Sequence, residues 1–417
     1  MSNPEYKDRI IDTILSEEMK AFGGVVITGP RMCGKTATAE HICPSGVYLR
    51  DKTEYGRYRT VSDIDPSILL NVPEYPLLID EWQIIPELWD EVRSFIDDKE
   101  TKGIFMLTGS NTIDESRISH SGIGRITTLR MYTLSLFEMG YSSGIVSLAH
   151  LFDTKKIITK RSENTIQEIA EIIVRGGWPN CIGTDLQSAR KTIAEYCKTM
   201  MNSDINIDRK HDPRKLTALL KALSRNESTC ATSESLMKEL ISRKQEMNIK
   251  TLYDYISALK KIYIVDDLPA WSPKLRSKTT VRVSDVRHLT DPSIAAHFLN
   301  AGPDDLLRDP NTFGLLFKSL VIRDLRVYAQ GLGAEIYHYR DADGLEADAV
   351  IHTPDGRWAA FEVKLSDKYL DDAAKNLLKL KNKVESEPEF LAVILPLGYS
   401  YRRNDGVFVI PITLLGP

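Results

Sequence analysis

The chain contains the stretch GPRMCGKT at residues 29–36, and this stretch indicates the fold of the first part of the chain. It carries every fixed position of the pattern G-x-x-x-x-G-K-[ST]. The apolar, mostly β-branched run VVI precedes it at residues 25–27, and a predicted helix follows from Thr36. A loop in this context binds phosphate, because its N–H groups and the positive end of the helix attract anions. The stretch therefore predicts a nucleotide site.

Individual positions of this loop have expected roles. Gly29 and Gly34 permit backbone torsions that other residues resist. Lys35 is predicted to reach the β- and γ-phosphates, and the Thr36 hydroxyl is predicted to bind Mg²⁺. Cys33 is either a small side chain that fits the loop or a reactive thiol. The full set predicted to surround the nucleotide is Gly29, Pro30, Arg31, Met32, Cys33, Gly34, Lys35, Thr36 and Ala37.

The second motif is YPLLIDE, residues 75–81, an apolar run that ends in two carboxylates. A short continuous apolar run is typical of a strand that is buried on both faces of a parallel sheet. Asp80, at the carboxyl end of this strand, is predicted to hold Mg²⁺ directly or through water. Glu81 is predicted to act as the general base that polarises the attacking water.

A third strand is predicted in GIFMLTGSN, residues 103–111, whose polar end is expected beside the other two. Ser110 or Asn111 is a candidate for sensing the γ-phosphate or orienting the water. Arg125 follows a glycine turn and is either an arginine finger for a neighbouring subunit's ATP or a surface arginine. Arg130 is a weaker candidate for the same role. Strand–helix alternation over residues 23–150 predicts a parallel α/β sheet.

Together these motifs resemble the AAA-type ATPases of prokaryotes. More narrowly, the chain resembles archaeal and bacterial proteins that join an AAA domain to a C-terminal DUF4143 domain. TLSLFE at residues 133–138, GGWP at residues 176–179 and a C-terminal pattern described below add to this resemblance. It implies ATP and Mg²⁺ as ligands, catalytic roles for Lys35, Glu81, Ser110 and Arg125, and a homo-oligomer.

The length and composition of the chain limit how many domains it has and which classes of protein it can belong to. A chain of 417 residues is long for one core, and we predict domains at 1–155, 156–300 and 301–417. The net charge of −4 argues against a chain that coats nucleic acid throughout. Five scattered cysteines favour a reducing cytosol, and no apolar run is long enough to span a membrane. We therefore expect a cytoplasmic protein.

The middle region is predicted to be helical and to end in a winged-helix-like module. Short helices over residues 233–262 precede two candidate strands at 263–265 and 280–283. Residues 250–287 are rich in lysine and arginine, and this positive charge favours contact with DNA phosphates. A lid with a solvated basic surface and a protein-docking module are the open alternatives. The basic residues are Lys250, Lys260, Lys261, Lys274, Arg276, Lys278, Arg282 and Arg287.

The C-terminal domain is predicted to be a mixed α/β unit with two carboxylates. Asp348, Glu362 and Lys364 form a D…E-x-K pattern that resembles the PD-(D/E)xK endonucleases and predicts a Mg²⁺ site. Lys318, on the preceding helix, stands where related sequences often carry glutamate, and lysine cannot bind Mg²⁺. An active nuclease, a degenerate binding or scaffold fold and an unrelated hairpin are the three interpretations that stay open.

Three functions compete at this point. The leading hypothesis is an ATP-driven molecular switch or motor associated with DNA. The second is an ATP-regulated, metal-dependent nuclease. The third is an adaptor that binds ATP without cycling and recruits a protein partner. Lys318 weakens the second hypothesis and leaves the other two open.

Overall fold

The computed structural model describes residues 6–110, 122–202, 205, 211–243, 247–273 and 284–417. The chain divides into two compact units, each described by itself below. The first consists of Met1–Tyr132 with Lys261–Tyr263, and the second of Thr133–Lys260 with Ile264–Pro417. Within the described part of the chain, no helix is both long and apolar enough to cross a membrane.

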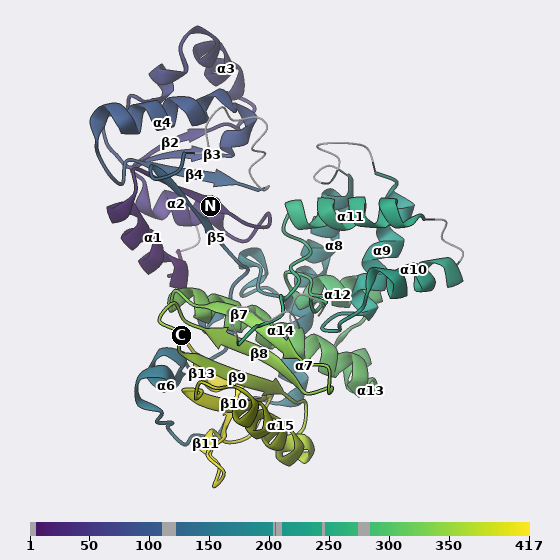
Figure 1. Cartoon of the computed structure of the whole chain (residues 1–417). Helices are drawn as coiled ribbons and strands as arrows, with labels where there is room; N and C mark the ends of the chain where they lie inside the picture. The colour runs from purple at the N-terminus through teal and green to yellow at the C-terminus, as the bar shows by residue number, and fades with distance from the viewer. Residues whose placement is uncertain (1–5, 111–121, 203–204, 206–210, 244–246, 274–283) are drawn as a thin grey trace. The chain divides into compact units, whose positions relative to one another are not determined.

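The first unit is built on a five-stranded sheet (Figure 1). The strands run in the order β2-β3-β4-β1-β5, and every neighbouring pair is parallel. The strands are β1 (Gly24–Thr28), β2 (Ser45–Tyr48), β3 (Leu77–Asp80), β4 (Phe105–Gly109) and β5 (Ile126–Arg130). The helices are α1 (Ile10–Ala21), α2 (Lys35–Ile42), α3 (Tyr55–Ile64) and α4 (Glu87–Lys99), with 3₁₀ turns at Pro66–Leu70 and Trp82–Ile84.

Helices cover both faces of this sheet, which explains why its central strands are apolar up to their polar carboxyl ends. On β1, Val26 packs in one core cluster with Trp89 of α4, whereas Val25 packs in the other with Leu15 of α1. Side chains alternate along a strand, so the continuous run VVI serves both layers. Burying each large apolar side chain contributes roughly 1.5–3 kcal/mol. The predicted parallel α/β sheet is confirmed.

The second unit begins with helices. They are α5 (Leu136–Met139), α6 (Leu148–Thr154), α7 (Ile166–Arg175), α8 (Leu186–Asn202), α9 (Pro213–Arg225), α10 (Ser233–Ser242), α11 (Ile249–Lys261), α12 (Pro292–Leu299), α13 (Pro303–Arg308) and α14 (Pro310–Gly331). A 3₁₀ turn at Pro179–Cys181 follows α7. The last residue of α11, Lys261, belongs to the first unit. The helical character predicted for the middle region is confirmed.

A mixed sheet of six strands completes the second unit, in the order β11-β12-β10-β9-β8-β7 (Figure 1). Its strands are β7 (Glu335–Arg340), β8 (Glu346–His352), β9 (Trp358–Val363), β10 (Phe390–Leu395), β11 (Tyr401–Arg402) and β12 (Phe408–Pro411). Helix α15 (Leu370–Lys383) packs on it. Short 3₁₀ turns lie at Asp367–Tyr369 and Ile412–Leu414, and β13 (Leu415–Gly416) pairs in parallel with β6 (Val146–Ser147). The mixed C-terminal α/β unit is confirmed.

A buried ionic network fastens the start of the second unit to α14. Arg323 pairs with Asp291 at 3.2 Å and with Asp324 at 2.7 Å, and all three side chains are almost fully buried. Asp291 also accepts from the Thr133 hydroxyl and the Gly177 N–H, at 3.0 and 2.9 Å. Removing one partner of such a network typically costs about 3–5 kcal/mol, because a charge is left buried. The motifs TLSLFE and GGWP therefore meet here.

The winged-helix prediction is only partly covered by the described residues. Helices α9, α10 and α11 are present, and isolated antiparallel bridges join Val265 to Leu289 and Leu268 to Val286. The second candidate strand, 280–283, lies outside the described residues. So do Lys274, Arg276, Lys278 and Arg282. The winged helix stays a prediction.

Glu227 is a fully buried carboxyl in the second unit. It accepts from the Ser319 hydroxyl at 2.8 Å and from the Leu289 N–H at 3.1 Å, and His288 Nδ1 lies 3.3 Å away. Burial raises the pKa of Glu227 to about 8, although the hydrogen bonds from Ser319 and Leu289 act in the opposite direction. The carboxyl is therefore protonated in the folded protein at neutral pH.

We expect Glu227→Gln to become more stabilising as pH rises. The folded pKa of Glu227 lies above its ordinary value, so the folded state binds more protons and wild-type stability falls as pH rises towards about 8. The melting temperature of Glu227→Gln minus that of wild type should grow between about pH 6 and about pH 8.5. Glu163→Gln, at an exposed loop position, is the control and should show no such trend. A pH-independent difference for Glu227→Gln would contradict a raised pKa.

Candidate functional site

The phosphate loop lies between β1 and α2 and needs two glycines. Gly29 has φ 147° and Gly34 has φ 107°, both in the region that disfavours other residues. A Cβ atom on Gly29 would also clash with the carbonyl oxygen of Met131. Gly34 is the residue before the first turn of α2, so its torsion directs the loop into the helix.

Lys35 fills the inside of this loop. Its ammonium donates to the carbonyl oxygens of Gly29 and Pro30, both at 2.9 Å, and the residue is only 6% exposed. Phosphate oxygens are stronger acceptors than neutral carbonyls, so a bound phosphate would compete for this ammonium. The arrangement fits the role predicted for Lys35.

The carboxylate of Asp80 joins the loop to the sheet. Its Oδ1 accepts from the Thr36 hydroxyl and from the Thr108 hydroxyl, both at 2.7 Å. Asp80 and Thr108 are partners in the parallel register of β3 and β4, so their side chains share one face. A hydroxyl and a carboxylate are suitable ligands for Mg²⁺, which prefers oxygen, and Thr36 and Asp80 together fit that ion.

Glu81 follows Asp80 and turns out of the strand. Its φ is 55°, in the left-handed region that is uncommon for a residue other than glycine. The Ser110 hydroxyl donates to Oε1, and Gln83 Nε2 donates to Oε2 at 2.5 Å. Arg50 Nη1 lies 3.3 Å from Oε1. Side chains from separate segments thus fix the position of this carboxylate.

The electrostatic surroundings keep Glu81 ionised. Burial alone would raise its pKa, but the Ser110 hydrogen bond and the charges of Lys35 and Arg50 outweigh burial and hold the pKa below its ordinary value. An ionised carboxylate can accept a proton from water. Because the group is held by hydrogen bonds, its geometry suits the general-base role predicted for it.

Sequence reasoning missed three members of this constellation: Thr108, Gln83 and Arg50. Thr108 is two residues before Ser110, and its polar character at the end of an apolar strand was the available signal. Arg50 comes from the segment after β2, and its proximity depends on β2 lying next to β3. Spacing in the sequence does not reveal that adjacency.

Other predicted residues lie apart from the Asp80–Glu81 cluster. Arg125 is 48% exposed and pairs with Asp97 at 2.8 Å. The Arg130 guanidinium stacks on two aromatic rings, those of Tyr132 at 4.9 Å and Tyr263 at 5.1 Å.

Of the remaining loop positions, Cys33 is fully buried, with its Sγ 3.8 Å from the carbonyl oxygen of Met131. Its burial favours the interpretation of a small side chain that fits the loop. Arg31 and Met32 are half-buried, and Ala37 is exposed on α2. Asn111 lies outside the described residues.

The C-terminal carboxylates do come together. Asp348 on β8 accepts from the Val363 N–H at 2.8 Å, and Lys364 donates to Glu362 at 2.5 Å and lies 4.0 Å from Asp348. Lys318 of α14 reaches the same place, with its ammonium 2.6 Å from Asp348 Oδ1. Two carboxylates therefore face two ammonium groups.

Because of these contacts, the two carboxyl groups have shifted pKa values, and the shifts are in opposite directions. Burial and the neighbouring Asp348 raise the pKa of Glu362 to about 8. Burial also opposes ionisation of Asp348, but Lys318 and Lys364 outweigh it and lower the pKa of that group. In the described part of the chain, no group of three or more His, Cys, Asp and Glu side chains is placed to hold a metal ion. Lys318, and no further oxygen ligand within the described residues, contacts Asp348 from α14.

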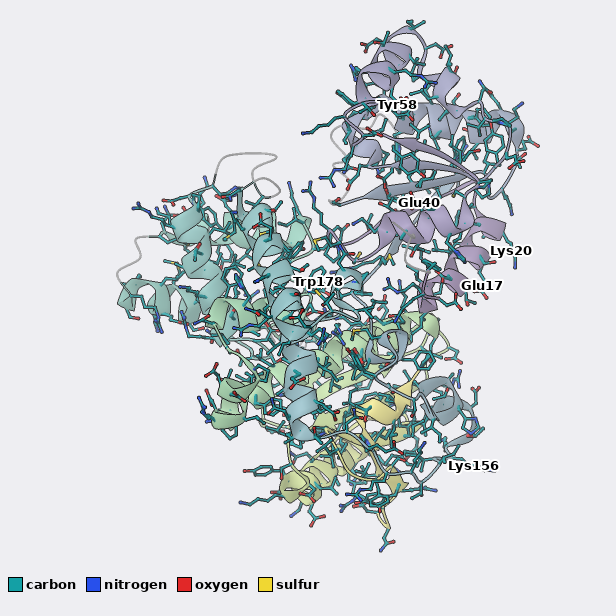
Figure 2. All side chains as sticks on the ribbon, turned by 180° about the vertical axis from the view of Figure 1, so that it is seen from behind. Glu17, Lys20, Glu40, Tyr58, Lys156 and Trp178 are labelled. Carbon is teal, nitrogen blue, oxygen red and sulfur yellow. The ribbon has the colours of Figure 1, made fainter. Side chains whose placement is uncertain are left out.

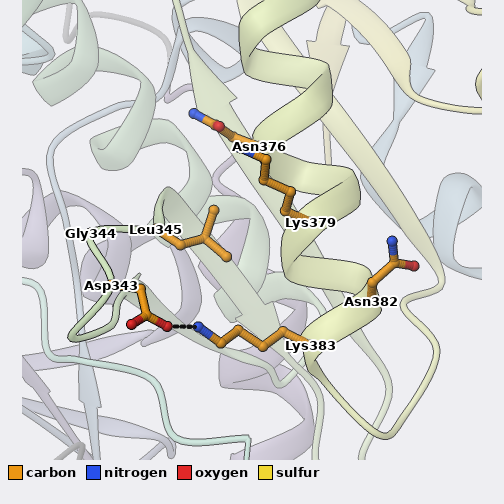
Figure 3. A pocket seen from close by; sticks show the side chains of 7 residues that line it. All are labelled: Asp343, Gly344, Leu345, Asn376, Lys379, Asn382 and Lys383. Atoms are coloured by element: carbon orange, nitrogen blue, oxygen red, sulfur yellow. Dashed lines mark hydrogen bonds and ion pairs between the residues drawn. The ribbon is translucent and has the colours of Figure 1, made fainter.

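A cavity of about 500 Å³ lies on the outer surface of the C-terminal sheet domain, between the loop before β8 and α15. Figure 3 shows Lys383 pointing towards Asp343. Lys383 is bound by Asp341 and Asp343, both at 2.6 Å. The positive charge of Lys383 is thus neutralised within the protein, whereas Lys379 is the other cation of this lining.

Comparisons with known families agree with the site geometry. Residues 22–140 match the model of an AAA domain, residues 166–305 match a domain of unknown function (DUF8612), and residues 313–415 match another (DUF4143). No curated protein sequence matches the chain.

Several solved structures are partly similar. The Walker-type ATPase PABY2304 of Pyrococcus abyssi is 15% identical, with 71% of this chain and 96% of that chain covered and a TM-score of 0.44. A variant of RuvB from Thermotoga maritima is 18% identical, with coverages of 62% and 89% and a TM-score of 0.29. These scores, both below 0.5, describe partial likenesses only. The family matches and the motifs together show that this chain joins an AAA domain, a nucleotide-binding ATPase domain, to a C-terminal DUF4143 domain.

Proposed function

We propose that this chain is a Mg²⁺-dependent ATPase that works as a molecular switch or motor and associates with DNA. The observation that carries the proposal is the convergence of Lys35, Asp80 and Glu81 at the carboxyl end of one parallel sheet. Phosphate, Mg²⁺ and the attacking water each need a different one of these groups. The AAA family match supports the same reaction.

In this proposal each residue has one task. The N–H groups of the loop and Lys35 hold the phosphates of ATP. Mg²⁺, when bound by Thr36 and Asp80, supplies positive charge to the β- and γ-phosphates. Glu81 accepts a proton from water, whose oxygen bonds to the γ-phosphorus as the bond to the bridging oxygen of ADP breaks. Ser110 keeps Glu81 in place through its hydroxyl.

Arg125 is assigned to a neighbouring subunit's site. Its ion pair with Asp97 is at the surface, where such pairs contribute little stability, so the guanidinium is free to exchange partners. A charge supplied in trans would make hydrolysis depend on a homo-oligomer.

DNA is the proposed partner because of the basic residues between 250 and 287. Among the described ones, Lys260 and Arg287 pair with Asp267 at 2.9 and 2.6 Å and thus serve the fold. Lys250 is exposed at the start of α11. We assign DNA contact to Lys250 together with Lys274, Arg276, Lys278 and Arg282, of which the last four lie outside the described residues.

The metal-dependent nuclease is the second candidate function. The observation in its favour is that Asp348, Glu362 and Lys364 lie together, as an endonuclease site requires. The observation against it is Lys318, whose ammonium takes the place next to Asp348. An adaptor that binds ATP without hydrolysing it is the remaining alternative.

We expect Thr108→Val to slow hydrolysis without abolishing nucleotide binding. The change keeps the shape of the side chain but removes the hydroxyl that donates to Asp80, so Asp80 is held by Thr36 alone. Loss of a supporting hydrogen bond of this kind lowers activity or metal affinity by about 10–100-fold. Steady-state ATP hydrolysis as a function of Mg²⁺ concentration is the measurement. Thr101→Val, at an exposed threonine of the same unit, should behave as wild type.

Glu81→Gln is expected to retain ATP and to lower turnover by about 100-fold or more, because the amide cannot act as a base. The assay is ATP hydrolysis with and without single- and double-stranded DNA, with DNA integrity scored in the same tubes. Glu17→Gln is the matched control, since Figure 2 shows Glu17 on the outer side of α1 and the residue is exposed.

The DNA arm of this assay separates the three functions. Hydrolysis that intact DNA stimulates supports the DNA-coupled ATPase. Cleavage of the DNA would revive the nuclease, and tight ATP binding with negligible hydrolysis by wild type would favour the adaptor. Unchanged turnover in Glu81→Gln would remove Glu81 from the role of base.

Lys318→Glu tests the C-terminal cluster. In wild type we expect Mn²⁺, added without nucleotide, to leave the melting temperature unchanged, because Lys318 and Lys364 already occupy the places beside Asp348 and Glu362. Lys318→Glu should be less stable without metal, since Asp348 loses its ammonium partner and faces another carboxylate, and Mn²⁺ should restore stability. Lys318→Ala should show at most a weak response to Mn²⁺. Stabilisation of wild type by Mn²⁺ that Asp348→Ala abolishes would instead support the nuclease.

A further inference from the structure

A pocket of about 350 Å³ lies among α7, α8 and α12 of the second unit, separate from the phosphate loop and the C-terminal carboxylates. We call it the α8–α12 pocket. Its volume falls within the range that small-molecule sites commonly have. Val174, Ile193 and Ala301 supply apolar, buried surface, and polar side chains from α8 and α12 complete the lining.

The charge of this lining is all of one sign. Arg190 and Lys191 of α8 carry positive charge, and no carboxylate is among the lining residues that the structure describes. His297 and Asn300 face the same space from α12 and its C-terminal end. Burial and the charge of Arg190 hold the pKa of His297 below its ordinary value, so its neutral ring adds a hydrogen-bonding group at pH 7.

Both cations are available to a ligand. Within the described residues, neither Arg190 nor Lys191 has an ion pair or a side-chain hydrogen bond. The carboxylate of Asp305 lies in the same neighbourhood, since a Cβ atom on Gly302 would be 3.5 Å from both Asp305 Oδ2 and Arg190 Nη1. It accepts from the Gly302 N–H at 2.9 Å, however, and in the part of the chain that the structure describes it forms no ion pair with Arg190. This contrasts with Lys383 in the cavity of Figure 3, which two aspartates neutralise.

The backbone at the end of α12 supplies partners for part of its own carbonyl groups. Helix C-termini leave carbonyl oxygens that attract positive charge. Here the carbonyl of Ala296 accepts from the Ala301 N–H at 2.9 Å, and that of His297 accepts from the Asn300 N–H at 3.0 Å. Two of the four carbonyls at this helix end therefore already have backbone partners.

The walls of the pocket are held in place by the core of the unit. Trp178, labelled in Figure 2, is almost fully buried and donates from Nε1 to the Ser293 hydroxyl of α12 at 3.0 Å. Its ring also packs on Tyr196 of α8, with centroids 4.6 Å apart. One tryptophan thus fixes both helices, so a ligand would meet a preformed site and lose little affinity to ordering it.

From these observations we propose that the α8–α12 pocket binds a small anionic molecule through a carboxylate or phosphate group held by Arg190 and Lys191. An arginine guanidinium offers two parallel donors to either group. The rest of the molecule lies against Val174, Ile193 and Ala301. This site is distinct from the ATP site, and the proposed ATPase function does not depend on it.

Calorimetric titration of the full chain tests this proposal. Citrate is the carboxylate probe and inorganic pyrophosphate the phosphate probe. Both are added to protein saturated with ADP, so that the phosphate loop is occupied, in buffer without Mg²⁺, because both anions chelate that ion. Wild type should bind at least one of them at micromolar to millimolar concentration. Arg190→Gln should weaken that binding about tenfold or more, as expected for the loss of a charge-assisted hydrogen bond.

Two further variants separate the pocket from general surface charge. Lys198→Gln removes one positive charge from the same helix outside the pocket and should bind the anion within about twofold of wild type. Ala194→Leu keeps every charge but fills the pocket and should weaken binding as Arg190→Gln does. Circular dichroism and melting curves confirm that each variant is folded.

Some outcomes would overturn the proposal. No heat with either anion in wild type excludes a small-anion site. Equal affinity of wild type, Arg190→Gln and Ala194→Leu would place the anion elsewhere. Binding of a single-stranded oligonucleotide that depends on Arg190, without binding of citrate or pyrophosphate, would make this face a nucleic-acid surface instead.

Discussion

The nucleotide site depends on one carboxylate oxygen. Oδ1 of Asp80 accepts from Thr36, at the start of α2, and from Thr108, on the neighbouring strand. Because β4 lies between β1 and β3, the phosphate loop and the acidic strand end are separated by one strand, and Thr108 spans that separation. A shift in the register of β4 would move Thr108 to the other face and release both neighbours. The position of Glu81 depends on the same register, because its N–H donates to the Thr108 hydroxyl.

Much of this site could be predicted from the sequence, and the reason is local. Short stretches of sequence carry most of the site, and their chemistry can be inferred without knowing the fold. They contain Gly29 and Gly34 with their torsions, the ammonium of Lys35 and the two carboxylates. What escaped prediction is non-local. Arg50 reaches Glu81 only because β2 pairs with β3, and Thr108 matters only because β4 pairs with β3. Strand order follows from packing between distant segments, and no single stretch encodes it.

The second unit shows the same limit more strongly. TLSLFE and GGWP were recognisable as parts of a resemblance, but their physical role needed the fold. Thr133 and Gly177 both donate to Asp291, which is paired with Arg323 of α14. Four segments that lie far apart in the sequence thus share one buried ion pair. Since breaking such a pair leaves an uncompensated charge, these segments must keep their places together.

Counter-ions decide what the polar clusters of the second unit can bind. Lys318 and Lys364 lie at hydrogen-bond distance from Asp348 and Glu362, so a divalent cation would have to displace these ammonium groups. The α8–α12 pocket is the opposite case, with Arg190 and Lys191 facing open space and no carboxylate among its described lining residues. Positive charge attracts a ligand only where the protein has not already neutralised it. Lysines therefore block the C-terminal carboxyl groups, whereas the cations of the α8–α12 pocket stay available. A second ligand is accordingly expected at this pocket rather than at the C-terminal cluster.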